Sequence, residues 1–181
     1  QFAATAYDDV AGGFLEDNSR MLSRAEKALV SEKDVLKSQR RKMTVCLRKV
    51  APETAIEKST WFHLETTMAM SMTYNLRRVN EVCKEHVDNN FRPLPAVFHD
   101  NLAAIREKIT AVLRDSEAAI EESRPDVIDG LRRRCDEIKN CLTARSREVY
   151  EFLRNDNDAD MTVAYVYLNL LQESQEMVTS L

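Results

Sequence analysis

The sequence has very few of the residues that interrupt regular structure: three Gly and four Pro in 181 residues. Sheet proteins need turn residues about every ten positions, so this scarcity argues against sandwiches, barrels and α/β units with Gly-rich loops. It also excludes a Gly-rich phosphate-binding loop. The sequence contains no G-x-S-x-G motif, and no Ser, His and acid arrangement stands out. The composition therefore predicts an all-α protein that is not an enzyme.

Long apolar runs and a strong net charge are also missing. The longest uncharged stretches, 66–76 and 161–172, are shorter than the roughly 18 to 20 apolar residues that span a bilayer. Twenty-six Lys and Arg against thirty Asp and Glu give a net charge of −4. A mildly acidic chain binds phosphate backbones poorly, so no nucleic-acid partner is expected. Because the chain starts at Gln1 and its helical pattern still runs at Leu181, we expect it to be part of a longer protein.

The four cysteines form no C-x-x-C pair. Cys46, Cys83 and Cys135 fall in phase with apolar helical positions, whereas Cys141 does not. This pattern predicts buried, reduced thiols that pack as small apolar groups, which fits a reducing, cytoplasmic compartment. A disulfide framework or a zinc site is the alternative.

Apolar residues recur at intervals of three, four or seven in five segments, which predicts five amphipathic helices. The predicted helices cover 14–50, 53–88, 96–122, 126–154 and 158–181. Gly12 and Gly13 suggest a flexible entry, so residues 1–13 are predicted as a flexible N-terminal segment and 14–181 as one domain. Short links make consecutive helices neighbours. The predicted fold is an antiparallel bundle of about five long helices.

The apolar stripes of the five predicted helices are the candidate core. The first comprises Leu22, Ala25, Leu29, Leu36, Met43, Leu47 and Val50. The second comprises Leu64, Met68, Met72, Leu76, Val79, Cys83 and Val87. The stripe of the third helix comprises Phe98, Leu102, Ile105, Ile109 and Val112, and that of the fourth comprises Ile128, Leu131, Cys135, Ile138, Leu142, Val149 and Phe152. The stripe of the last helix comprises Met161, Tyr165, Leu168, Leu171 and Val178. Each stripe predicts a buried helix face, and the methionines are interpreted as adaptable core residues in preference to a partner groove.

Acidic residues near the end of the second helix form the one candidate metal site. Glu81 and Glu85 are four positions apart and share a helix face, and His86 and Asp88 follow directly. Carboxylates and an imidazole in an inter-helix groove could hold a divalent cation. A solvated acidic face, with His86 near the negative end of the helix dipole, is the structural alternative. No other cofactor is predicted.

Two other metal patterns fail. Asp156, Asp158 and Asp160 resemble the start of an EF-hand loop, but Met161 stands where that loop needs Gly and Tyr167 where it needs Glu. A ferritin-like di-iron bundle needs Glu-x-x-His on two helices, and no His in the sequence has Glu three positions before it.

The first predicted helix is basic. Residues 20–50 contain ten Lys and Arg against three Asp and Glu. A solvated helix face is the simplest interpretation, and attraction to an acidic partner or to anionic lipid headgroups is the alternative.

Three segments carry a resemblance to a known family: Tyr74-Asn75-Leu76-Arg77-Arg78-Val79, then His86-Val87-Asp88-Asn89-Asn90 with Pro93-Leu94, and Tyr167-Leu168-Asn169-Leu170-Leu171-Gln172-Glu173. Over residues 14–181 the chain resembles the PhoU-like C-terminal domain of inorganic phosphate permeases of the PiT family from Bacteroidetes-type bacteria.

The resemblance implies a PhoU-like bundle built from three-helix units, on the cytoplasmic side of the inner membrane. It implies a domain that modulates phosphate uptake through helix contacts and performs no chemistry. Its partner would be the permease part of the same chain or a separate phosphate transporter, with a second copy of the chain as a further partner. Many PhoU proteins bind metal through E/D-x-x-x-D motifs, and Asp156 with Asp160 has this spacing here.

Three alternatives stay open at the level of sequence. The first is a freestanding PhoU-like regulator that binds a transporter or a sensor kinase. The second is a metal-binding bundle. The third is a plain coiled-coil scaffold, since heptad stripes also form rods.

Overall fold

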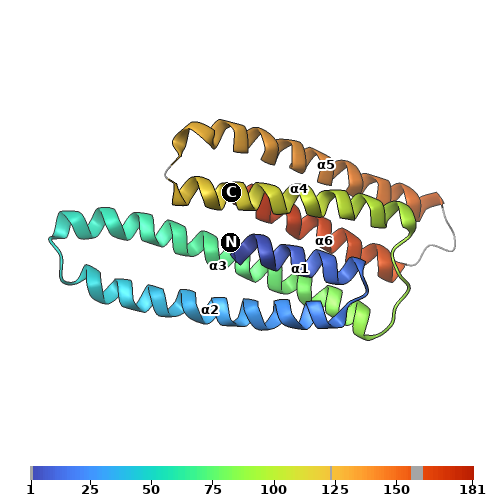
Figure 1. Cartoon of the computed structure of the whole chain (residues 1–181), viewed down its shortest axis with the longest axis horizontal. Coiled ribbons are helices and arrows are strands. Elements are labelled where there is room, and N and C mark those ends of the chain that lie inside the picture. The colour runs from blue at the N-terminus through green and yellow to red at the C-terminus, as the bar shows by residue number, and fades with distance from the viewer. Residues whose placement is uncertain (1, 123, 156–160) are drawn as a thin grey trace.

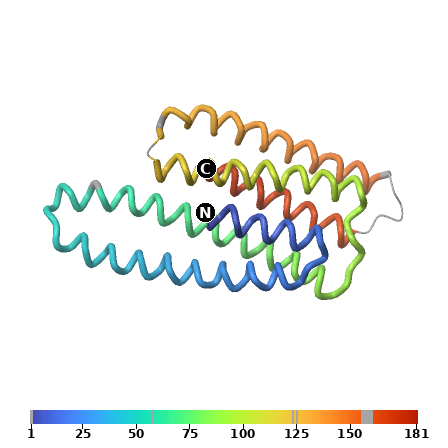
Figure 2. Tube along the Cα trace, viewed as in Figure 1, coloured from blue at the N-terminus to red at the C-terminus, as the bar shows by residue number. Residues whose placement is uncertain are grey.

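The chain forms an all-α bundle, as the sequence predicts (Figures 1 and 2). The structure is a computed structural model, and it describes residues 2–122, 124–155 and 161–181. Within these ranges there are six α-helices, one short 3-10 helix and no strand. They are α1 (Phe2–Leu15), α2 (Ser19–Leu47), α3 (Pro52–Asp88), α4 (Ala96–Glu121), the 3-10 helix η1 (Pro125–Val127), α5 (Ile128–Asn155) and α6 (Met161–Thr179).

The helices are arranged as two three-helix units that share one interface. Helices α1, α2 and α3 pack on one another, as do α4, α5 and α6. The second helix of each unit, α2 or α5, lies on the outside of the molecule (Figure 1). The first helices, α1 and α4, meet across the interface, and so do the third helices, α3 and α6. Because equivalent helices pair, the two units face each other in a two-fold-like manner.

One hydrophobic core runs through both units. It draws buried side chains from all six α-helices, so neither unit has a core of its own. At the centre, the ring of Phe98 from α4 stacks on that of Tyr167 from α6, with ring centroids 5.1 Å apart. The hydroxyls of Tyr7 and Ser174 share a 3.1 Å hydrogen bond that joins α1 to α6. The two units therefore bury apolar side chains against each other in one shared core.

The N-terminal segment is a correction to the sequence analysis. Residues 1–13 are predicted as flexible, but Phe2–Leu15 forms α1, which lies between α2, α3 and α4. Its buried face includes Tyr7, Val10 and Phe14. The two glycines that suggested flexibility lie inside this helix because a neighbour approaches closely at each. A Cβ at Gly12 would lie 2.7 Å from the guanidinium of Arg106, and one at Gly13 would lie 2.9 Å from Leu22.

A helix break at residues 16–18 separates α1 from α2, where a single helix over 14–50 is predicted. Asp17 adopts a left-handed conformation, with φ of 52°, and the backbone N–H of Asn18 bonds to the carbonyl of Gly13 at 2.7 Å. The side chain of Asn18 then accepts bonds from the backbone N–H groups of Arg20 and Met21, capping α2. Asp, Asn and Ser in succession are a helix-start signal that the apolar periodicity hides.

The predicted apolar stripe of α6 is confirmed in part, because Leu171 and Val178 are buried. Met161 and Tyr165, which the sequence analysis assigns to the apolar face, are 67% and 63% exposed. The side chains of Val163, Val166 and Tyr167 are buried instead. This helix is apolar on several sides and packs against both α3 and α5, so a single stripe describes it poorly. Within the described residues, no helix has an apolar stretch of the length that a bilayer crossing requires.

The cysteine prediction is confirmed in part. All four thiols are free, and Cys83 and Cys135 are buried as predicted, whereas Cys46 is exposed. The burial of Cys83 raises the pKa of its thiol above the ordinary value of 9.0. Burial likewise raises the pKa of Tyr7 and of Tyr167 above the ordinary 10.0.

These shifts predict a loss of stability in alkaline solution. A group whose pKa is raised by folding stabilises the folded state below its ordinary pKa, and this stability is lost as the pH rises above that value. We expect the free energy of unfolding to fall above about pH 9, by up to about 1.4 kcal/mol per pH unit for each group. Urea unfolding followed by circular dichroism measures the slope. The variant Cys83→Ala should have a shallower slope just above pH 9, and an unchanged slope would contradict the argument.

Candidate functional site: an apolar groove at one end of the bundle

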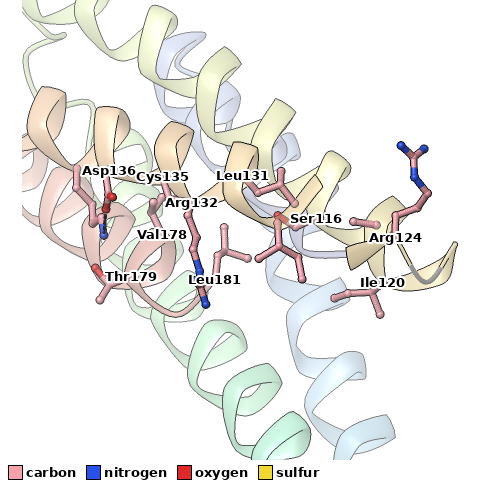
Figure 3. Close-up of a pocket in the computed structure, with 13 residues that line it drawn as sticks. Ser116, Ile120, Arg124, Leu131, Arg132, Cys135, Asp136, Val178, Thr179 and Leu181 are labelled. Carbon is pink, nitrogen blue, oxygen red and sulfur yellow. Dashed lines mark ion pairs between the residues drawn. The ribbon is translucent and has the colours of Figure 1, made fainter. Parts of the chain in front are cut away.

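A groove of about 910 Å³ lies between the C-terminal parts of α4 and α6 and the N-terminal half of α5 (Figure 3). Side chains from all three helices and from the link before α5 line it. They are Ser116, Ala119, Ile120, Arg124, Ile128, Leu131, Arg132, Cys135, Asp136, Lys139, Val178, Thr179 and Leu181. Because the groove belongs to one three-helix unit, the shared interface of the two units does not cover it.

The groove is apolar inside, and its rim carries paired charges. Ile120 is 78% exposed and Ile128 is 44% exposed, so apolar area faces solvent there. Arg124 donates to Asp126 at 2.8 Å, and Lys139 pairs with Asp136 at 2.6 Å, so carboxylates offset the charge of both cations. The hydrogen bond from Arg124 lowers the pKa of Asp126. Exposed aliphatic side chains in a groove between helices suit the apolar face of an amphipathic helix.

The thiol at the floor of the groove is not set up as a nucleophile. Cys135 is 7% exposed, and burial raises the pKa of its thiol, which keeps it protonated at neutral pH. A nucleophilic cysteine needs a lowered pKa and access to its substrate. The chemistry that the groove offers is therefore apolar binding.

The four residues of the predicted metal site are not brought together. Glu81 is exposed and pairs with Arg77 at 3.5 Å. Glu85 is also exposed. The carboxylate of Asp88 accepts a 2.5 Å hydrogen bond from the hydroxyl of Ser19. Across the described ranges, no group of three or more His, Cys, Asp and Glu residues is close enough to hold a metal ion.

His86 lies on the opposite side of α3, inside the bundle. It is 3% exposed, and its ring meets those of Phe14 and Phe91 edge to face, at centroid distances of 5.3 and 5.5 Å. Its Nε2 hydrogen-bonds to the carbonyl oxygen of Arg92 at 2.9 Å. Each residue turns a helix by about 100°, so His86 points away from Glu85 although it is adjacent in sequence. His86 thus stabilises the turn after α3.

The other acidic residues considered for metal binding, Asp156 and Asp160, lie outside the described residues.

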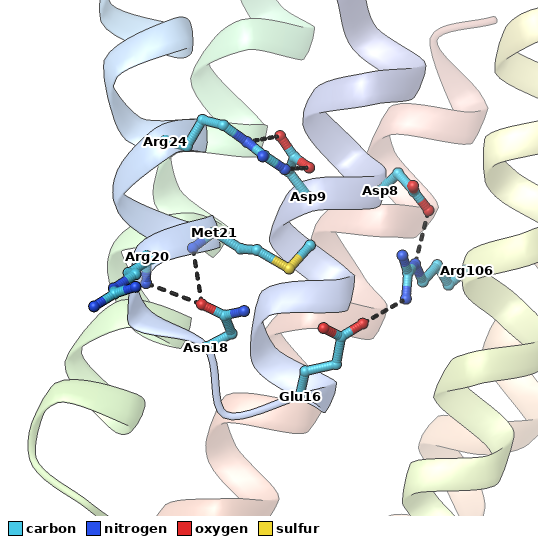
Figure 4. A network of polar contacts seen from close by, with 8 residues as sticks. All are labelled: Asp8, Asp9, Glu16, Asn18, Arg20, Met21, Arg24 and Arg106. Carbon is cyan, nitrogen blue, oxygen red and sulfur yellow. Dashed lines mark hydrogen bonds and ion pairs between the residues drawn. The ribbon is translucent and has the colours of Figure 1, made fainter.

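An ion-pair network that was not predicted from the sequence joins the two units (Figure 4). Arg106 on α4 donates to Asp8 on α1 at 2.7 Å and lies 3.8 Å from Glu16. Nearby, Arg24 on α2 donates to both carboxylate oxygens of Asp9. The network connects α1 to α2 and to α4. Its signal in the sequence is the pair of adjacent acids Asp8 and Asp9, which were not considered because residues 1–13 were predicted as flexible.

The two helical segments that carry the family resemblance pack against each other. Arg78, from the Tyr74–Val79 segment, pairs at 2.9 Å with Glu173, from the segment that starts at Tyr167. Glu173 is 5% exposed, so its carboxylate is held inside the α3–α6 contact between the two units. A buried carboxylate needs such a partner. The third segment forms the turn that His86 holds.

Together, the fold and the groove define an all-α bundle of two three-helix units with an open apolar groove at one end. Comparison with known proteins finds no family model, no curated protein and no solved structure that matches this chain.

Proposed function

We propose that the chain is a non-catalytic regulatory domain of an inorganic phosphate transport system, of the PhoU-like kind. The observation that carries the proposal is the Arg78–Glu173 pair, because it joins two segments of the resemblance at the contact between the two units. The resemblance implies three-helix units, and the pairing of α1 with α4 and of α3 with α6 supports that layout.

The proposed mechanism is contact between helices. The apolar groove takes the apolar face of an amphipathic helix of the transporter. Because α4, α5 and α6 all border the groove, and α4 and α6 also form the interface with the other unit, an occupant changes the packing of both units. A regulator of this kind works through the difference in its contacts between two states of the transporter.

Phosphate uptake in the host of this gene tests the proposal. Deletion of the segment that encodes this chain should change the uptake of labelled phosphate severalfold and leave sulfate uptake unchanged. The double variant Ile120→Glu, Ile128→Glu places two charges in the groove at exposed positions, so it should reproduce the deletion while the protein still folds.

The matched control places the same charges elsewhere on the same unit. Tyr150 and Tyr165 are 62% and 63% exposed and do not line the groove, so Tyr150→Glu, Tyr165→Glu should regulate as the unchanged protein does. Phosphate uptake that is unaffected by the deletion, or sulfate uptake that changes equally, would contradict the proposal.

A further inference from the structure

The α2–α3 hairpin extends well beyond the rest of the bundle (Figure 2). In the shared core, the last buried residue from α2 is Leu29 and the first from α3 is Leu76, with the partly buried Met72 packed against the core. We call residues 37–68 the hairpin tip. At about 1.5 Å per residue, its two arms are roughly 16 and 25 Å long. The tip therefore projects beyond the other helices, so a flat binding partner contacts the tip before it contacts the rest of the bundle.

Apolar side chains of the tip are exposed where the sequence pattern predicts burial. The stripes of α2 and α3 are buried beside the bundle, at positions such as Leu22 and Leu76, but Val50, Leu64 and Met68 are 42%, 49% and 44% exposed. Other apolar residues of the tip are more exposed still. They are Val45 at 54%, Ile56 at 70% and Trp61 at 68%. Exposed apolar groups gathered in one region mark an interaction site.

The tip is also the basic part of an acidic chain. It holds seven Lys and Arg against three Asp and Glu, a net charge of +4 in a chain of −4, so the remaining residues carry −8. The seven cations are Lys37, Arg40, Arg41, Lys42, Arg48, Lys49 and Lys58. On α2, Val45 has Arg41 and Lys42 four and three positions before it, and Arg48 and Lys49 follow the end of the helix at Leu47, so cations flank this exposed apolar group on both sides.

This combination of charge and exposed apolar residues fits the surface of an anionic membrane. Lys and Arg are attracted to anionic headgroups, and Trp is favoured at the boundary between headgroups and acyl chains. Ile56 and Trp61 are five positions apart, about 140° around the helix, so no single flat partner face covers both. The soft interfacial layer of a bilayer surrounds a convex tip on every side. Contact between the tips of two copies would bring two charges of +4 together.

We propose that the hairpin tip docks on anionic lipid bilayers, with the basic residues of α2 on the headgroups and Trp61 in the interfacial layer. The proposal does not depend on which ion, if any, the protein regulates. It stands on the projection of the tip, its exposed apolar residues and its charge, so it can fail or hold independently of the proposed function.

The tip carries its own reporter, because Trp61 is the single tryptophan of the chain. Vesicles of phosphatidylcholine mixed with phosphatidylglycerol should shift the Trp61 emission to shorter wavelength, and brominated lipids should quench it. Pure phosphatidylcholine vesicles should have neither effect. Binding should weaken as salt rises to 1 M, because the screening length falls from about 10 Å at 0.1 M to about 3 Å.

Charge reversal separates the tip from the general charge of the protein. Each Lys or Arg near an anionic surface contributes about fivefold to partitioning, so Arg41→Glu, Lys42→Glu, Arg48→Glu should lower it by at least about a hundredfold. The control Arg114→Glu, Arg133→Glu, Arg147→Glu makes the same change in charge at exposed positions of α4 and α5. It should bind vesicles nearly as well as the unchanged chain.

Co-sedimentation with vesicles tests the apolar part without relying on fluorescence. Trp61→Ala should lower partitioning by about tenfold, because it removes a side chain that the bilayer buries. Tyr150→Ala, at an equally exposed aromatic residue of α5, should not change it. The proposal is overturned by equal binding to neutral vesicles, by equal loss in the tip and control variants, or by a Trp61 shift that depends on protein concentration without vesicles, which would indicate a second copy.

Discussion

Replacement of Tyr167 by Ala is expected to destabilise the protein by about 3–5 kcal/mol, as for other large aromatic residues removed from a core. Tyr167 is 0% exposed, and its ring stacks on Phe98, which joins α6 to α4 within the second unit. The truncation leaves a cavity at the point where α4 and α6 meet the rest of the core, and surrounding helices can fill it only in part. Urea unfolding followed by circular dichroism measures the loss.

Tyr165 provides the matched control, because it is the same residue type on the same helix and is 63% exposed. Tyr165→Ala should change the free energy of unfolding by no more than about 0.5 kcal/mol. The hydroxyl of Tyr167 is buried and has no hydrogen-bond partner among the described residues. Tyr167→Phe should therefore stabilise the fold by about 1 kcal/mol or more, because it removes an unpaired polar group. Equal losses in Tyr165→Ala and Tyr167→Ala would contradict this account of α6.

Removal of residues 1–13 is expected to abolish folding of the remaining chain. The deletion takes away most of α1, which contacts three other helices. Tyr7 and Val10 are almost completely buried. Each large apolar side chain contributes about 1.5–3 kcal/mol by burial, and a typical domain has only about 5–15 kcal/mol of net stability. The measurement is the helical signal of the truncated chain and its loss on heating.

A point variant tests the same prediction in the full chain. Val10→Asp buries a carboxylate at a position that is 0% exposed, so it should destabilise the fold by several kcal/mol. The control Val30→Asp makes the same substitution on α2 at a position that is 44% exposed, and it should cost no more than about 1 kcal/mol. A truncated chain that melts cooperatively at the same temperature as the full chain would restore the view that residues 1–13 are a dispensable tail.

Both ends of α3 were predictable because the residues that begin and end a helix act locally. Pro52 begins α3 one residue from its predicted start, and α3 ends at Asp88 as predicted. The break at Asp17 was missed because residues 14–50 were predicted as one helix, although residues 16–20 are all polar and the side chain of Asn18 caps α2. Local signals of this kind compete, and the capping hydrogen bonds prevailed over the periodicity.

The predicted metal site shows the limit of spacing arguments. Glu81 and Glu85 do share a face, as their spacing requires, but that face is exposed and Glu81 pairs with Arg77. Proximity in sequence placed His86 beside them, whereas helix rotation directs it to Phe14 and Phe91. Phe14 comes from α1, far from His86 in sequence, and no pattern within α3 contains that information.

Periodicity and the scarcity of Gly and Pro determined that this chain is a bundle of long helices, because helix formation depends on contacts within a few residues. Burial depended on how far each helix extends beside its neighbours. Leu22 and Leu76 lie within the six-helix core, while Val50 and Leu64 have the same kind of pattern and remain exposed on the hairpin tip. Only the tertiary structure decided this difference, because a stripe of apolar residues specifies a face to be covered but not the helix that covers it.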